Sequence, residues 1–148
     1  MFIISVQSNP TFNPSFVDGY FKQLAADFYL SKSQEEELAE IMRREQGDRI
    51  DDQRDVRDRT LRPLAPATIF MKGSSMALKR TGALRNSIRK YRVKDGYDIK
   101  PNENRESIAS WTHYGTSKMR PFGWFGYEPG TQLDYKVDRF LDDKLKKI

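Results

Sequence analysis

The stretch that decides the fold class reads SIRKYRVKDGYDIK, from Ser87 to Lys100. Residues that favour β-strands lie on both sides of Asp95-Gly96, and an Asp-Gly pair is typical of a tight hairpin because Gly supplies a positive φ. The residues before the pair alternate between two faces, although both faces are partly polar. We therefore predict an antiparallel hairpin with strands at 87–93 and 97–100.

Helical patterns lie on both sides of this hairpin. A first helix is predicted from Pro14, because apolar side chains recur there every four residues. The recurring residues are Phe16, Tyr20, Leu24 and Phe28. A last, amphipathic helix is predicted after Thr131, a candidate N-cap. The chain is thus expected to form an α+β domain, in which a small, mostly antiparallel β-sheet is packed by N-terminal and C-terminal α-helices.

The region between the first helix and the hairpin is highly charged. Ser33 and Glu36 have the spacing of a capping box, which predicts the start of a second helix. Residues 43–59 then carry six basic and six acidic side chains. This composition predicts that 43–60 is a solvated helix or mobile loop. A segment that becomes ordered only against a partner subunit is the alternative.

The remaining segments are short. Pro63 and Pro66 interrupt any regular helix, so residues 61–72 are interpreted as a stiff surface loop. A short helix capped by Thr81 is expected at 82–87, and a bent strand at 120–127. Residues 107–114 fit either a strand or a short helix. All 148 residues are expected to form a single domain, with 1–13 as an N-terminal arm or strand.

Composition argues against several functional classes. The chain has no Cys and a single His, His113, which we interpret as a packed or hydrogen-bonded residue. No catalytic motif or nucleotide-binding fingerprint is present, and no stretch is apolar enough to span a membrane. We therefore expect no enzymatic activity, no metal or other cofactor, and no membrane association.

The net charge of +5 is concentrated in residues 72–105, which hold ten basic and three acidic side chains. Such an asymmetry favours contact with nucleic acid or with an acidic protein surface. The residues that we select as this basic face are Arg85, Arg89, Lys90 and Arg92.

Short motifs follow one another in a fixed order through the second half of the chain. They read PLAPATI at 63–69, a Lys at 72, LKRTGALRNSI at 78–88, HYGT at 113–116 and RPF at 120–122. Taken alone, each motif fits a common local structure, such as a turn, a helix cap or an apolar anchor. Their combined order resembles the tailed-phage virion morphogenesis and tail-completion family of neck, or head–tail joining, proteins. The matching positions are Leu64, Pro66, Thr68, Lys72, Leu78, Thr81, Gly82, Leu84, Ser87, Ile88, His113, Gly115, Arg120, Pro121 and Phe122.

The resemblance covers roughly residues 60–148 and departs from the family in three places. The segment 123–130 is longer and more aromatic than is expected for the family. Leu61-Arg62 stands where the family usually has an aromatic residue, and Ile108-Ala109 replaces a common Tyr-Ala pair. These departures concern the subfamily rather than the general class.

The resemblance implies a structural virion protein that forms an oligomeric ring at the neck or at the top of the tail. Such a ring would complete the tail and allow head–tail joining. Its implied partners are further copies of itself, connector or adaptor proteins, tail-terminator or tail proteins, and packaged DNA contacted without sequence preference. It would be found in the virion, after assembly in the host cytoplasm. The alternatives are a tail-tube terminator ring protein and a small basic nucleic-acid-binding protein.

Two surfaces are expected to make these contacts. The basic face would meet the DNA conduit or an acidic partner. An aromatic group would anchor contacts between subunits, because buried aromatics dominate the energetics of interfaces. This group consists of Phe122, Trp124, Phe125 and Tyr127. Arg120 is expected to bridge either to a carboxylate of a neighbouring subunit or to one within its own chain.

Overall fold

The computed structural model describes residues 15–72, 76–79, 82–94, 96–117 and 120–145. The helices are α1 Ser15–Asp27, α2 Lys32–Asp52, α3 Pro66–Lys72, α4 Ala83–Ser87, α5 Glu106–Tyr114 and α6 Gln132–Leu145. A 3₁₀ turn, Glu103–Arg105, precedes α5, and the strands are β1 Ile88–Val93 and β2 Gly96–Pro101. The fold is therefore α+β, as predicted from the sequence.

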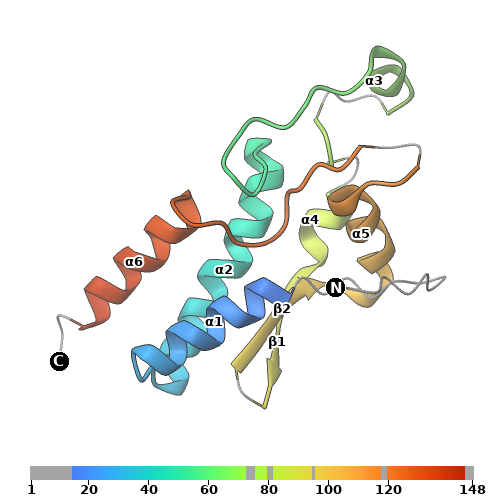
Figure 1. Ribbon diagram of the computed structural model, residues 1–148. Helices are drawn as coiled ribbons and strands as arrows, with labels where there is room; N and C mark the ends of the chain where they lie inside the picture. The colour runs from blue at the N-terminus through green and yellow to red at the C-terminus, as the bar shows by residue number, and fades with distance from the viewer. Residues whose placement is uncertain (1–14, 73–75, 80–81, 95, 118–119, 146–148) are drawn as a thin grey trace.

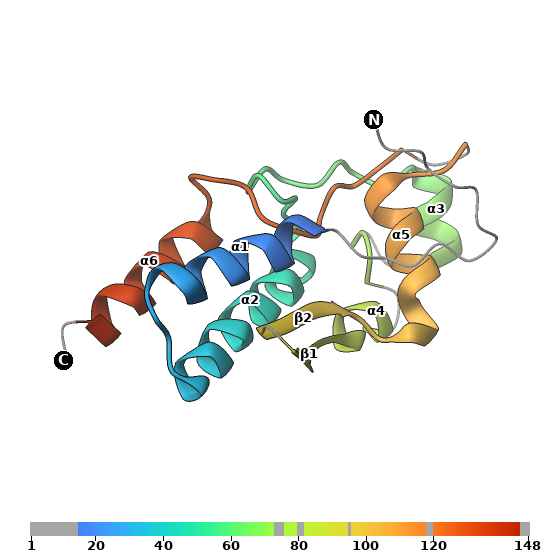
Figure 2. The same cartoon turned by 60° about the horizontal axis from the view of Figure 1, so that its bottom comes forward.

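Helix α2 lies at the centre of the molecule, between α6 on one side and the hairpin on the other (Figures 1 and 2). Helices α1 and α2 both pack against the hairpin, and α6 packs against α2. The core between them contains Phe21, Leu38, Met42, Ile88 and Ile99, none of which exposes more than 2% of its surface. Burial of these large apolar side chains is the main term that stabilises the arrangement.

The predicted hairpin is confirmed. Strands β1 and β2 pair antiparallel, with Ile88 opposite Pro101 and Val93 opposite Gly96. Gly96 has a φ of +146°, and a Cβ placed on it would lie 2.6 Å from a ring carbon of Phe21. A glycine is therefore required here both by the backbone conformation and by the close approach of α1.

Both predicted helices before the hairpin exist, but details of each prediction were wrong. Tyr20 and Leu24 of the predicted face pack against the core, but the fully buried ring is Phe21, and Phe28 lies beyond the end of α1 and is 37% exposed. Strict four-residue spacing drifts around a helix of 3.6 residues per turn, so the predicted face matches the buried one only in part. In α2 the capping box is formed by Ser31 and Gln34, two residues earlier than predicted.

Later segments also differ from expectation. Residues 66–72 are helical rather than a loop, because Pro66 occupies the first position of α3, where its missing N–H costs nothing. Residues 106–114 form a helix, which decides between the two alternatives for 107–114. Residues 120–127 pair with no strand within the described chain, so the predicted bent strand was wrong. The predicted Thr81 cap and the arm at 1–13 lie outside the described residues.

Candidate interaction surfaces

The charged region after residue 43 contains a buried polar network. Glu45, Gln46 and Arg49 are fully buried on α2, and Arg54 is only 8% exposed. The prediction of a solvated segment was therefore wrong for these four residues. Glu45, Arg49 and Arg54 pair in the interior of the molecule, whereas Arg57 and Arg59 form their ion pairs at its surface.

Two members of this network hold the segment that follows the RPF motif. The Arg49 Nη1 donates to the carbonyls of Trp124, at 3.1 Å, and of Gly126, at 2.8 Å. The Gln46 side chain exchanges two hydrogen bonds with the Gly126 backbone. Burial, opposed by the nearby Glu45 carboxylate, lowers the pKa of Arg49 to about 10, so the guanidinium stays charged at neutral pH.

Glu45 is the carboxylate at the centre of the network. It accepts from Arg54 Nη1 at 2.9 Å and from Lys136 Nζ on α6 at 2.6 Å. Arg54 also donates to Asp58, at 2.6 Å, and the second Asp58 oxygen accepts from the Gln132 backbone N–H at the start of α6. The network thus fixes α6 and residues 124–126 to α2. Its role is to position these segments.

His113 contributes to the same scaffold, as predicted. Its Nδ1 accepts a hydrogen bond from the Phe125 backbone N–H, at 3.2 Å. Burial, and next the positive charge of Arg49, lower the pKa of His113 to about 4. The ring is therefore neutral at neutral pH, with Nδ1 unprotonated, and it can hold the chain in place.

Arg62, just before the PLAPATI motif, meets the RPF motif next to His113. Arg62 Nη2 donates to the Arg120 carbonyl at 2.7 Å, and its guanidinium lies 4.1 Å from the centre of the Phe122 ring. The Phe122 N–H donates to the Thr112 carbonyl on α5, at 2.9 Å. Arg62 and the RPF motif are therefore packed together at the end of α5.

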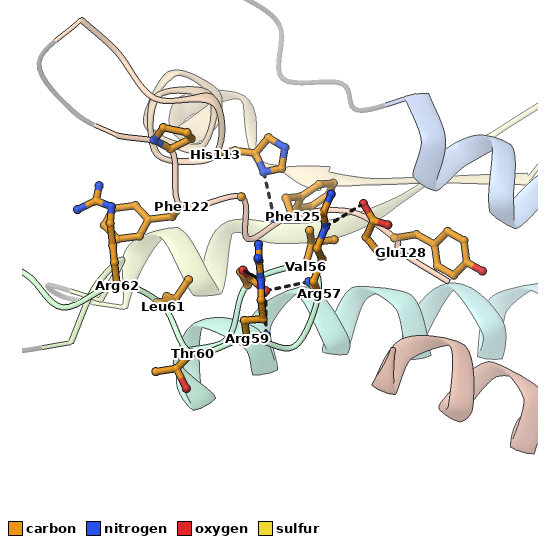
Figure 3. Close-up of a pocket in the computed structure, with 14 residues that line it drawn as sticks. Val56, Arg57, Arg59, Thr60, Leu61, Arg62, His113, Phe122, Phe125 and Glu128 are labelled. Carbon is orange, nitrogen blue, oxygen red and sulfur yellow. Dashed lines mark hydrogen bonds and ion pairs between the residues drawn. The ribbon is translucent and has the colours of Figure 1, made fainter. Parts of the chain in front are cut away.

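A groove of about 670 Å³ lies between these segments, which is within the size range of clefts that bind ligands (Figure 3). Its apolar lining comes from Val56, Leu61, Pro121, Phe122, Phe125 and Tyr127. Charged side chains surround it. Arg59 Nε lies 3.1 Å from Asp55, and Arg57 Nε lies 3.8 Å from Glu128, whereas Arg62 forms no ion pair among the described residues. The groove is therefore lined by both apolar and polar side chains.

The LKRTGALRNSI region contacts the C-terminal end of α2 instead. Lys79 Nζ and Arg85 Nε bind the two oxygens of Asp51, at 3.0 and 2.8 Å. Next to them, the Gln53 side chain and the Ala77 backbone exchange two hydrogen bonds. This motif thus anchors the chain before the hairpin.

The predicted basic face is largely neutralised within the chain. Besides the Arg85–Asp51 pair, Lys90 Nζ lies 3.3 Å from Glu40, and Arg92 Nη1 lies 3.7 Å from Glu35. Arg89 is exposed and has no carboxylate partner among the described residues. Acidic residues of α2 therefore neutralise three of the four cations of the predicted basic face.

The aromatic residues predicted to anchor subunit contacts belong mainly to the core. Trp124 and Phe125 expose no surface, and Phe122 exposes 9%. Tyr127 is half-buried and stacks on Tyr20, with ring centres 3.6 Å apart. A side chain with no exposed surface cannot contact another subunit, so the prediction was wrong for Trp124 and Phe125.

The large apolar side chains that are exposed lie elsewhere. On α3, Phe70 is 86% exposed and Met71 is 81% exposed. On α5, Trp111 and Tyr114 are about half exposed, at 49% and 57%. Figure 1 shows that α3 projects away from the other helices, at the end of an extended connection. The sequence signal was the apolar run Ile69-Phe70-Met71, which begins three residues after Pro66 and was not interpreted as a surface feature.

Most of the other described motif residues lie in the core or at turns of the backbone. Leu64 packs against the core, and Thr68 is exposed on α3. Leu84, Ser87 and Ile88 are buried around the start of β1. Gly82 and Gly115 both have a positive φ, at +80° and +82°. Arg120 is exposed and forms no ion pair with a described residue, so a salt bridge inside its own chain is not seen.

Comparison with known proteins yields no relative, since no family model, curated protein or solved structure matches this chain. Within the described residues, no helix has the length and apolar character needed to cross a membrane. The same residues contain no group of three or more His, Cys, Asp or Glu side chains that could hold a metal ion. A function for this chain is therefore inferred from its motifs and from the surfaces described above.

Proposed function

We propose that this chain is a structural virion protein of a tailed bacteriophage. Copies of it would form a ring at the neck or at the top of the tail, complete the tail and allow the head to join. Its partners would be further copies of itself, the connector or adaptor, and the tail-terminator or tail proteins. The function would be one of binding, with complementary surfaces buried between subunits and against neighbouring rings.

The observation that carries the proposal is the fixed order of the motifs in the second half of the chain. One feature of the structure supports it. Helix α3 carries Phe70 and Met71 into solvent, and exposed apolar surface of this kind marks sites of protein association.

The alternative of a small nucleic-acid-binding protein has less support. That function would use the basic residues of the hairpin, with Tyr91 and Tyr97 as stacking groups. However, Lys90 and Arg92 are paired with acidic residues of α2, and Tyr97 is only 9% exposed.

Negative-stain imaging of particles made without this protein tests the proposal. The expected result is free heads beside complete tails, with joining restored when the wild-type chain is supplied in trans. Tails of irregular length would favour the terminator position instead. Normal, joined virions would contradict the proposal in both forms.

A further inference from the structure

A hollow of about 460 Å³ lies where α1, the start of α2 and the end of the hairpin meet, and its size is within the range of clefts that bind ligands. Among the described residues that line it, four are cations and one is a carboxylate. The cations are Lys22, Lys32, Arg92 and Lys94, and the carboxylate belongs to Glu35. The hollow therefore concentrates positive charge, which attracts anions.

Packing contacts hold the walls of this hollow in fixed positions. Phe21 of α1 is fully buried, and a Cβ added to Gly96 would lie 2.6 Å from its ring. Arg92 Nη1 lies 3.7 Å from Glu35 of α2, and the guanidinium carbon of Arg92 lies 5.1 Å from the centre of the Tyr97 ring. Elements that are distant in the sequence are therefore brought together around the hollow by the packing of the domain.

Three of the four cations have no carboxylate partner. Lys22, Lys32 and Lys94 are exposed, and none of them forms an ion pair with another described residue. Each comes from a different part of the fold, since Lys22 lies on α1, Lys32 is the first residue of α2 and Lys94 directly follows β1. Their charges therefore converge on the hollow from three sides. Only the Arg92 charge is neutralised there, by Glu35.

The chemistry of the lining favours a phosphate group as the ligand. A lysine ammonium binds phosphate as a compact point charge with three donors. A phosphate group has enough acceptor oxygens to meet several ammonium groups at once, whereas a carboxylate has only two. The uncharged residues of the lining, Ala25, Ala26 and Gly96, are small, so an apolar ligand would find little surface to contact.

We propose that this hollow binds a phosphate group through Lys22, Lys32 and Lys94. Two sources share this chemistry, the backbone of DNA and a free polyphosphate ion, and the test below separates them. Recognition by point charges has little sequence preference and weakens as the salt concentration rises. The inference goes beyond the proposed function and does not depend on it, because phosphate binding is a property of the purified chain.

Two double variants test the site. The first carries Lys22→Gln and Lys94→Gln and removes two of the three unpaired charges. The matched control carries Arg105→Gln and Arg139→Gln, which removes the same net charge at cations that line no part of the hollow and have no carboxylate partner among the described residues. Circular dichroism establishes beforehand that both variants are folded, as expected for substitutions outside the core.

Isothermal titration with sodium tripolyphosphate measures binding of the free ion. The first variant should bind it at least about tenfold more weakly than the wild type, because two charge-assisted contacts are lost, and the control should remain within about twofold. Equal weakening in the two variants would mean that only the overall charge matters, and it would overturn the inference.

Fluorescence anisotropy with a short labelled DNA duplex, at a series of salt concentrations, measures binding of the DNA backbone. If DNA is the source, the plot of log affinity against log salt should become shallower by about 2 for the first variant and stay unchanged for the control. Loss of tripolyphosphate binding with unchanged DNA binding would assign the site to the free ion. Binding of neither probe by the wild type, or affinities that the first variant leaves unchanged for both probes, would overturn the inference.

Discussion

Gln46 on α2 and Gly126 after the RPF motif are joined by two reciprocal hydrogen bonds. The Gly126 N–H donates to Gln46 Oε1 at 2.8 Å, and Gln46 Nε2 donates to the Gly126 carbonyl at 3.1 Å. Both groups are buried, so water cannot replace either bond if the side chain is removed. An interaction between residues 80 positions apart thus fixes the segment that forms one side of the groove.

We expect Gln46→Ala to lower the free energy of unfolding by about 2 kcal/mol, because it leaves the buried Gly126 N–H without an acceptor, whereas the Gly126 carbonyl keeps its bond from Arg49. Equilibrium unfolding in urea measures this change. The control is Gln23→Ala, which removes an exposed amide bonded to Asp27 and should change stability by less than about 0.5 kcal/mol. Similar effects of the two substitutions would contradict the structural role of the Gln46–Gly126 pair.

The pKa of His113 predicts how stability depends on pH. In the folded chain it is lowered to about 4 from an ordinary value of 6.5, so the unfolded chain binds a proton more readily. The contribution to stability is therefore fully present above pH 6.5 and is lost as the pH falls towards 4. Between pH 7 and 5 the expected loss is about 2 kcal/mol.

His113→Asn tests the origin of this pH dependence, because an Asn oxygen can replace Nδ1 as acceptor for the Phe125 N–H but does not titrate. As His113 is the single His of the chain, few other groups titrate in this range. Urea unfolding at a series of pH values should show a much flatter profile for the variant. A variant with the same slope as the wild type would rule out His113 as its source.

The close approach of Gly96 to Phe21 predicts a second localised effect. A methyl group at position 96 would collide with the Phe21 ring and would also strain the backbone at a φ of +146°. We expect Gly96→Ala to destabilise the protein by about 2 kcal/mol or more. Thermal unfolding followed by circular dichroism measures the effect.

Gly19 on α1 provides the matched control. A Cβ at this position meets no atom within 4 Å, and Ala is the better helix former, so Gly19→Ala should stabilise by about 0.5–1 kcal/mol. Adding Phe21→Leu to Gly96→Ala should recover the part of the loss that comes from the collision. If Gly96→Ala were neutral, the packing of α1 on the hairpin turn would be different from that described.

Local patterns predicted the hairpin and the amphipathic α6 because both are encoded within a few residues. Asp95-Gly96 specifies a turn, and the spacing of Leu133, Val137 and Leu141 specifies a helix face. The surfaces could not be predicted in this way. Whether Arg92 is free depends on Glu35, which lies more than fifty residues earlier in the chain. Sequence spacing contains no information about which distant carboxylate a cation will meet.

The same limit explains the error over the aromatic group. From the sequence, Trp124 and Phe125 were assigned to a bent strand whose aromatic side chains would contact another subunit. Their burial results from Gln46 and Arg49, which sit in a segment whose composition suggested full solvation. The contacts of Gln46 and Arg49 with the backbone of residues 124–126 therefore explain why both segments are buried, contrary to the prediction.

A pair of substitutions tests whether Trp124 belongs to the core of the monomer or anchors a contact between subunits. Trp124 is fully buried and its Nε1 donates to Thr112 Oγ1 at 3.0 Å, so Trp124→Ala should destabilise the protein by about 3–5 kcal/mol. Phe70 is 86% exposed, so Phe70→Ser should change stability by less than about 0.5 kcal/mol. Urea unfolding of the two variants at low protein concentration measures both. If Trp124 instead anchored a contact between subunits, its truncation would leave the monomer as stable as the wild type, and the core described for residues 122–126 would be incorrect.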